Sequence, residues 1–316
     1  MKKFQDWQGT IIVWALLLTM PFWIGHIGGY TTLGTRVVVL AVAAMSVNFL
    51  LGFTGVLSFG HAAYFGLGAY GAGLTIKYLA ASSMAGLVAG VLLGTVGAML
   101  IGLMIVRLRG VYFAMVTIAF GQIFYFVSFR WVNLTGGDDG LTGWTRMPLS
   151  LGPLSLDILH DETAFYYFVL ACFGAAAAGM ALLLRSPFGR TLLAIRENER
   201  RARFLGIPVD QHIWMSFVIS AAFASLAGVV YAYLNNFVDP RAFRWDQSGD
   251  FVIMAVLGGM RSFWGPLIGA AIFVVLQDKL SSLTDYWMTP LGLFFVLAVV
   301  FFPRGVLGML KRRRAT

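Results

Sequence analysis

The sequence predicts an all-α polytopic membrane protein, a bundle of about ten transmembrane helices in which one helix is short or broken. Of its 316 residues, 59% are hydrophobic and only 12% are charged, whereas soluble domains keep roughly a quarter of their residues charged. Several apolar stretches, such as MAGLVAGVLLGTVGAMLIGLMIV, approach or reach the roughly 20 residues that cross a bilayer. The net charge of +9 fits basic loops retained on the cytoplasmic side and gives no indication of nucleic-acid binding.

The first half of the chain is expected to cross the membrane five times. Lys2 and Lys3 place the N-terminus inside, and Arg107 and Arg109 place a later loop on the same side. The hydrophobic start lacks a small-residue cleavage site, so we interpret it as an uncleaved first helix. The expected helices cover 10–28, 32–51, 58–78, 84–106 and 111–130.

Charge also places the two long loops. Residues 131–162 carry five acidic residues against Arg146, with Gly and Pro turn signals, and are expected to form an extracytoplasmic loop. After a helix over 163–184, residues 185–213 carry six arginines and are expected inside. Within them, ENERRARFLG predicts a short polar helix that ends at Gly206.

The C-terminal third is expected to supply a helix over 214–234 and three further crossings over 251–303. Gly258, Gly259, Gly265 and Pro266 interrupt the apolar run, and splitting the segment there returns the basic C-terminus to the cytoplasm. Broken backbone at membrane depth is tolerated where protein or a water-filled cavity surrounds it. A plain loop at the inner surface is the alternative.

The stretch LLGFTGVLSFGHAAYFGLGAYGAGL contains GLGAYG, which matches the G-x-G-x-x-G dinucleotide fingerprint. That fingerprint requires a preceding strand and an acidic residue about 20 positions later, and no acidic residue occurs between Trp7 and Gly137. On a helix, Ala62, Gly66, Ala69 and Gly73 instead form a stripe of small residues that favours close helix packing.

Polar residues in the expected spans are candidates for the translocation pathway. These candidates are Asn48, Ser58, His61 and Gln122. His61 either borders the pathway or hydrogen-bonds a neighbouring helix, and Ser58 is expected to cap the helix that follows it. The four histidines show no metal-ligand spacing, and the single cysteine, Cys172, excludes an internal disulfide. No metal, cofactor or catalytic residue is therefore predicted.

The predicted spans contain no acidic side chain of the kind that binds a coupling ion in proton- or sodium-driven carriers. Energy for uphill transport would then come from another protein. The 185–213 segment is either a docking surface for such a partner or an ordinary basic loop, and the residues alone leave both interpretations open.

The segments GFTGVLSFGHAAYFGLGAYGAGL, LTGGDDGL, FGRTLLAIRENERRARFLGI and VLGGMRSFWGPLIGA resemble permease subunits of ATP-binding-cassette (ABC) importers for branched-chain amino acids, specifically the LivM-type half. The resemblance runs from about residue 35 to about residue 310. It implies a non-enzymatic permease in the bacterial inner membrane, with both termini cytoplasmic. The implied partners are a second homologous permease, two cytoplasmic ATPase subunits and an extracytoplasmic substrate-binding protein.

The resemblance also assigns the 185–213 segment to ATPase coupling. The family's coupling loop corresponds here to Gly189, Arg190, Ala194, Arg196, Glu197, Ala202 and Gly206. Related permeases carry urea, short amides or other small carboxylates, so these substrates remain alternatives to branched-chain amino acids. A passive channel or facilitator is a second alternative.

Overall fold

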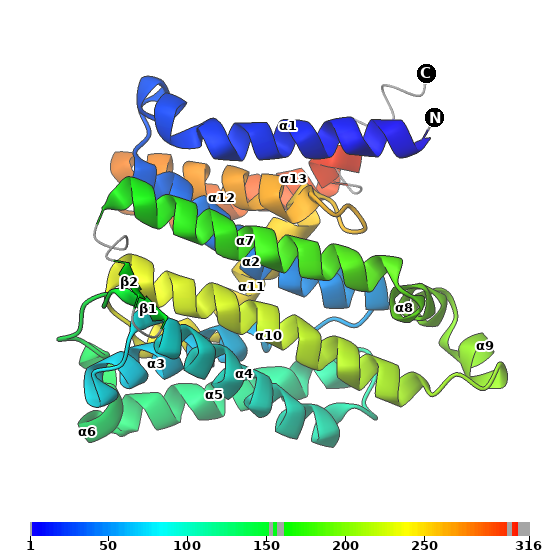
Figure 1. Ribbon diagram of the computed structural model, residues 1–316. Coiled ribbons are helices and arrows are strands. Elements are labelled where there is room, and N and C mark those ends of the chain that lie inside the picture. The colour runs from blue at the N-terminus through cyan, green and yellow to red at the C-terminus, as the bar shows by residue number, and fades with distance from the viewer. Residues whose placement is uncertain (1, 152–153, 157–160, 302–304, 309–316) are drawn as a thin grey trace.

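A computed structural model describes residues 2–151, 154–156, 161–301 and 305–308. Figure 1 shows a bundle of long helices that run roughly side by side, with one short hairpin. The α-helices are α1 (Lys2–Trp23), α2 (Thr31–Asn48), α3 (His61–Leu79), α4 (Ser83–Ile105), α5 (Val111–Arg130), α6 (Val132–Thr135), α7 (Glu162–Arg185), α8 (Pro187–Glu197), α9 (Glu199–Phe204), α10 (Val209–Asn235), α11 (Trp245–Gly258), α12 (Gly265–Leu283) and α13 (Met288–Phe301). Strands β1 (Leu149–Leu151) and β2 (Leu154–Leu156) pair antiparallel.

The predicted all-α polytopic class is confirmed. Within the described residues, six helices are long and apolar enough to cross a membrane. The expected spans at 84–106, 111–130 and 163–184 each agree with a helix to within one residue at either end. Ten of the helices in the described part of the chain have 14 or more residues. Helices α11 and α13 are the shortest of these, with 14 residues each, and α11 is the short helix that the glycine-rich interruption predicts.

Helix α2 forms the centre of the bundle. With the π-helical turn that follows it (Phe49–Thr54), it makes a span of which 89% of the most apolar window is buried inside the protein, against 28% for α5 and 33% for α4 and α7. It packs against α7, α10 and α12, while α3 and α4 pack on the other side of α10. The strongly apolar but exposed surfaces of α4, α5 and α7 therefore suit lipid or a partner chain.

Helix α3 begins inside the bundle, three residues later than predicted. The chain from Gly55 to Gly60 is not helical, and Gly60, not Ser58, occupies the N-cap position. The Ser58 hydroxyl instead accepts a hydrogen bond from the Gly60 amide at 3.2 Å. The Phe59 amide in this non-helical segment donates to the Thr117 hydroxyl of α5 at 3.3 Å, so this polar backbone group is satisfied inside the protein.

The small residues of α3 pack differently from the predicted stripe. The closest backbone approaches are made by Gly68, where an added Cβ would lie 2.2 Å from the Ser225 oxygen, and Gly71, where it would lie 2.8 Å from the Gly90 Cα. Gly66 and Gly73 face side chains, chiefly Phe243 and Leu141. The tight helix–helix contact thus runs along the Gly68–Gly71 face toward α10 and α4.

The expectation that spans contain no acidic residue is wrong for α12, whose candidate span Gly265–Leu283 contains Asp278, and for α11. Helix α11 begins at Trp245, six residues before the predicted start, so Asp246 and Asp250 lie within it. Asp250 is half-buried and interacts electrostatically with Arg36 of α2. The polar sequence WDQSGD gives no hydrophobic pattern from which this part of the helix could be predicted. The helix is buried by contacts with α2, α3 and α12.

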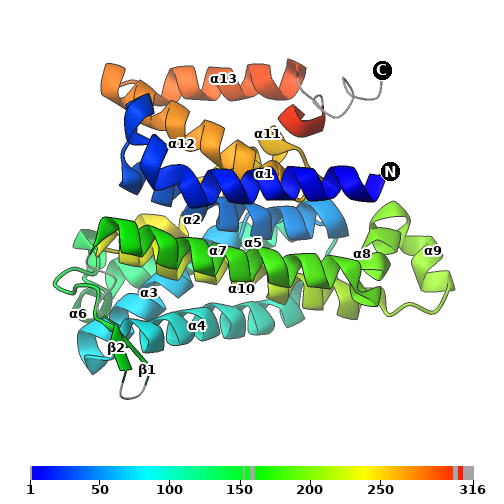
Figure 2. The ribbon, with the colours of Figure 1, turned by 45° about the horizontal axis from the view of Figure 1, so that its top comes forward.

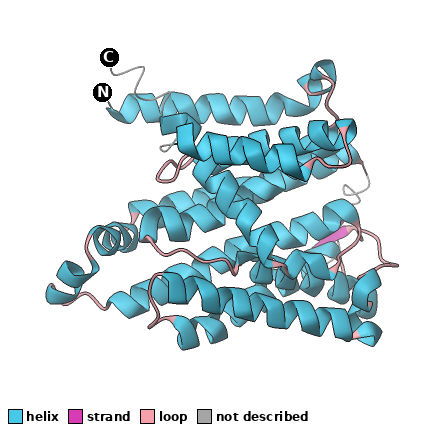
Figure 3. Ribbon diagram, turned by 180° about the vertical axis from the view of Figure 1, so that it is seen from behind, coloured by secondary structure: helices cyan, strands magenta, loops and turns pink. Residues whose placement is uncertain are grey.

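The two ends of the bundle differ. Helices α8 and α9 project from the end at which α1 begins, and β1, β2 and α6 lie at the opposite end (Figure 2). The view from behind shows the same separation (Figure 3). The acidic 131–162 segment contains α6 and the hairpin, whereas Asp157 and His160 lie outside the described residues.

Candidate coupling surface and buried polar core

Helix α8 forms because its start carries two helix-initiating residues. The Ser186 hydroxyl accepts from the Gly189 amide, and Pro187 occupies the first turn. Gly189 is buried, and an added Cβ would lie 2.5 Å from the Leu184 oxygen. A glycine is therefore required for the chain to turn this sharply from α7 into α8. The sequence prediction of one short polar helix missed α8.

A second helix, α9, follows after a corner at Asn198. The Asn198 side chain accepts from the Arg201 amide at 2.9 Å and so caps α9. Gly206 has a φ of +80°, and its amide donates to the Arg203 oxygen, a glycine-terminated helix end as the sequence predicts. Ala202 is buried in a small apolar cluster with Ile195 and Ile213 that fixes both helices to the end of the bundle.

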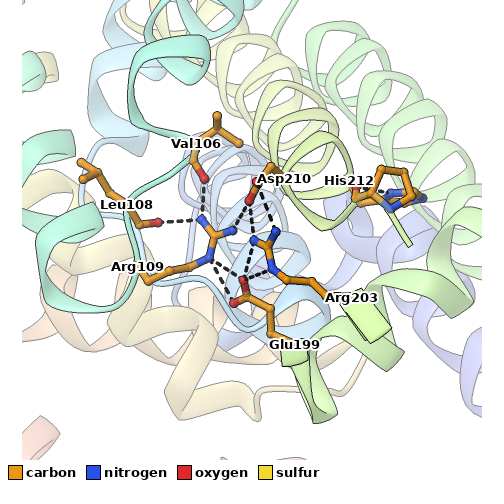
Figure 4. A network of polar contacts seen from close by, with 8 residues as sticks. Val106, Leu108, Arg109, Glu199, Arg203, Asp210 and His212 are labelled. Carbon is orange, nitrogen blue, oxygen red and sulfur yellow. Dashed lines mark hydrogen bonds and ion pairs between the residues drawn. The ribbon is translucent and has the colours of Figure 1, made fainter. Parts of the chain in front are cut away.

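A network of two arginines and two carboxylates holds α9 in place (Figure 4). Arg109, in the loop between α4 and α5, pairs with Glu199 at 2.9 Å and also with Asp210. Arg203 pairs with Glu199 at 2.9 Å and with Asp210 at 2.7 Å. Because both carboxylates are shared, the network joins α9 to the α4–α5 loop and to the first turn of α10.

The outer surface of α8 and α9 is exposed and partly apolar. Phe204 is 90% exposed and Leu205 is 74% exposed, at the C-terminal end of α9. Figure 2 shows α9 projecting from the bundle. Arg190, Ala194 and Glu197 are also exposed. Large apolar side chains on a polar projection indicate contact with another protein. The sequence analysis missed Phe204 and Leu205, although their position at the end of an arginine-rich helix was a visible signal.

Arg196 points inward, in contrast to its neighbours on α8. Its guanidinium donates to the main-chain oxygen of Gly52 in the π-helical turn after α2. Gly55 has a φ of +83°, and an added Cβ there would lie 2.8 Å from the Arg196 Cγ. The arginine side chain thus lies across this turn, and α8 is joined directly to the central span.

Asn48 extends this connection to the segment between α11 and α12. Asn48 is 2% exposed, and its amide donates to the Ser262 oxygen at 3.1 Å. That segment contains Arg261, whose φ of +72° is unusual for a side chain with a Cβ. Contacts therefore run from α8 through the turn at Gly52 to the interruption between α11 and α12.

His61 is part of a hydrogen-bond chain through the bundle core. The Ser220 hydroxyl donates to the Ser46 oxygen at 2.5 Å, and His61 Nε2 lies 2.7 Å from the same hydroxyl. A serine has one proton to donate, so Nε2 must be the donor to Ser220. His61, which is 1% exposed, thereby joins the start of α3 to α10 and α2.

The four pathway candidates do not form one cluster. Ser58 and His61 lie together at the start of α3, Asn48 contacts Ser262, and the half-buried Gln122 lies on α5. No group of histidine, cysteine and carboxylate side chains that could hold a metal occurs among the described residues.

Comparisons with known proteins point to membrane transport. The family model described as the permease component of branched-chain amino acid transport systems matches residues 29–302. The chain is 29% identical to the high-affinity branched-chain amino acid transport system permease protein LivM of Escherichia coli K12, over 94% of this chain and 73% of that protein. No solved structure gives a significant match.

Two further relatives extend the comparison. A probable branched-chain amino acid transport permease protein LivM of Methanocaldococcus jannaschii is 26% identical, over 86% of this chain and 78% of that protein. The permease protein LivH of Escherichia coli K12 is 31% identical over a shorter region, 42% of this chain and 44% of that protein.

Proposed function

This chain belongs to the family of permease components of branched-chain amino acid transport systems, and on that premise we propose that it is the permease subunit of an ABC importer that moves branched-chain amino acids inward. The chain itself supplies the membrane path. Partner ATPases supply the energy, and the chain has no catalytic role. The substrate assignment follows from the functions named for its relatives.

The observation that carries this proposal is the projecting pair of helices α8 and α9. They are fixed to the bundle by buried apolar residues and by the Arg109 network, yet they present Phe204 and Leu205 outward. A passive channel has no need for a rigid projection of this kind. An importer driven by a separate ATPase requires one, because force must pass between the two proteins.

The contacts of Arg196 and Asn48 support a route for that force. Movement of α8 would displace the Gly52 turn, and Asn48 would transmit the displacement to the segment around Ser262. In this mechanism ATP binding and hydrolysis bias a bundle that has two states. Gly189, Arg190, Ala194, Arg196, Glu197, Ala202 and Gly206 form the coupling segment together with Phe204 and Leu205.

The proposed assembly contains four kinds of subunit. Similarity to both LivM and LivH supports pairing with a second, homologous permease. Two ATPases would bind α8 and α9 at the cytoplasmic end, and a substrate-binding protein would dock at the opposite end, near β1, β2 and α6. Both termini would then be cytoplasmic, in the inner membrane of a bacterium.

Orientation can be tested with one cysteine at a time, after Cys172→Ala removes the native thiol. We expect Arg190→Cys to react with a membrane-impermeant maleimide only in inside-out vesicles, and Asp138→Cys only in right-side-out vesicles. The reverse pattern would contradict the orientation.

Substrate selectivity tests the function itself. The chain is reconstituted in proteoliposomes with its second permease, ATPases and binding protein, and ATP-driven uptake of labelled leucine is measured. Excess isoleucine or valine should compete, whereas urea and acetamide should not. Competition by urea alone would replace the amino-acid assignment with the urea alternative.

A further inference from the structure

A cavity of about 470 Å³ lies between α1, α7 and the segment that joins α11 to α12. Its walls include Ala177, Ala181 and Leu184 on the second half of α7, which leads directly into α8. Trp14 and Trp264 also line the cavity and form an edge-to-face pair, and Trp264 Nε1 donates to the Thr10 hydroxyl at 3.1 Å. The cavity therefore combines apolar walls with indole rings, which favour the membrane interface.

Two arginines line the cavity, Arg185 at the end of α7 and Arg261 in the α11–α12 segment. Both side chains are exposed, and neither has a hydrogen bond or ion pair within the described part of the chain. None of the residues that line the cavity is acidic. Among the described residues, no acidic side chain therefore lines this site to balance its positive charge.

A third arginine adds to this charge. Burial lowers the pKa of Arg196, and repulsion by the Arg261 guanidinium lowers it further. Arg196 is held in place by its bond to Gly52 and cannot move away from Arg261 without losing that contact. An anion between Arg185 and Arg261 would relieve the repulsion.

We propose that this cavity binds one anionic glycerophospholipid, with its phosphodiester between Arg185 and Arg261 and an acyl chain along the alanine-lined wall of α7. Arginine pairs recognise phosphate oxygens through paired N–H donors, and basic pockets between transmembrane helices bind anionic lipid head groups. The site lies at the end of the bundle from which α8 projects, which the proposed orientation makes the inner leaflet.

The bound lipid would also contact the coupling route. Ser262 lines the cavity and accepts the hydrogen bond from Asn48, and Phe53 lines it from the Gly52 turn. A lipid in this place therefore stabilises one arrangement of the α11–α12 segment. This inference goes beyond the transport function and does not depend on which amino acid is carried.

The test uses native mass spectrometry of the full chain in its assembled complex. The complex is supplied with phosphatidylglycerol, with phosphatidylcholine of the same acyl chains, or with soluble glycerol 3-phosphate. We expect preferential retention of one phosphatidylglycerol per copy, and a drop of about fivefold for each of Arg185→Gln and Arg261→Gln. Arg185→Lys should retain much of the binding, and Arg107→Gln, an exposed arginine outside the cavity, should behave as wild type.

Two variants separate lipid binding from loss of folding. Ala181→Phe fills the apolar wall while both arginines remain, and it should abolish lipid retention without lowering the yield of assembled complex. Equal retention of the two lipids, or wild-type retention by the Arg185→Gln/Arg261→Gln double variant, would overturn the proposal. Displacement of the lipid by glycerol 3-phosphate at equal concentration would also overturn it, because the site would then recognise a free phosphate.

Discussion

The Arg196 guanidinium donates a hydrogen bond to the main-chain oxygen of Gly52 and thereby joins α8 to the central span of the bundle. Other arginines of the segment, Arg190, Arg200 and Arg201, are exposed to solvent. The bond is charge-assisted and half-buried, so it is stronger than an ordinary surface contact. It connects the coupling segment to the π-helical turn that directly follows Asn48.

Arg196→Ala should separate ATP hydrolysis from transport. Loss of a hydrogen bond from a charged donor costs about 1.5–3 kcal/mol, which weakens the equilibrium that holds α8 against the Gly52 turn by roughly tenfold or more. Less leucine should therefore be imported per ATP hydrolysed. The ratio is measured in proteoliposomes that contain the whole complex. Arg130→Ala, at the exposed end of α5 and outside the coupling segment, is the control and should keep the wild-type ratio. An unchanged ratio for Arg196→Ala would show that force does not pass through Gly52.

Phe204→Ser should weaken attachment of the ATPase without unfolding the permease. The side chain is 90% exposed, so its removal leaves no cavity in the bundle. A buried aromatic anchor at an interface contributes about 2 kcal/mol or more, so the dissociation constant should rise by about thirtyfold. Leu79→Ser, 73% exposed at the end of α3, provides a matched control. Wild-type co-purification of ATPase with the Phe204 variant would remove this residue from the interface.

Arg109→Ala should loosen α9 while leaving the spans intact. It removes the contacts that Glu199 and Asp210 make with the α4–α5 loop, although Arg203 keeps its own pairs with both. Because these side chains are about one-third exposed, the expected cost is only about 1 kcal/mol. Hydrogen exchange of the α9 amides should accelerate, and the exposed Arg107→Ala should leave it unchanged. Equal exchange in both variants would mean that the apolar cluster alone holds α9.

His61→Ala should destabilise the start of α3, whereas His61→Gln should retain most of the stability. Glutamine offers an N–H donor to Ser220 in place of Nε2, but alanine leaves the buried hydroxyl without that partner. The expected loss for alanine is about 1–2 kcal/mol in the free energy of unfolding. Thermal unfolding in detergent measures it. If glutamine is as damaging as alanine, the ring itself, and not its Nε2 proton, is what the site requires.

Much of the architecture could be predicted because the length of an apolar run in the sequence indicates the length of the membrane helix that it forms. The spans of α4, α5 and α7 were readable from hydrophobic runs, and the glycines at 258–265 indicated the interruption between α11 and α12. Helix boundaries that depend on tertiary contacts could not be predicted from the sequence. Asp250 became part of a buried helix only because α2, α3 and α12 surround α11.

In the coupling segment, too, features set by the local sequence could be predicted, and features set by tertiary contacts could not. Gly206 ends α9 for a local reason, its positive φ, and was predicted. The inward direction of Arg196 depends on a carbonyl 144 positions earlier in the chain, which no local pattern encodes. Likewise Ser58 was expected to cap α3, but packing of Gly60 against Thr117 moves the helix start and gives Ser58 a different bond.

The most direct test of a coupled permease is the dependence of leucine uptake on ATP in sealed proteoliposomes that contain this chain, a second permease, the ATPases and the binding protein. The account predicts accumulation of leucine above its external concentration with ATP inside, and none with ADP. Equal uptake with ATP and ADP, levelling at the external concentration, would contradict it and identify a passive channel.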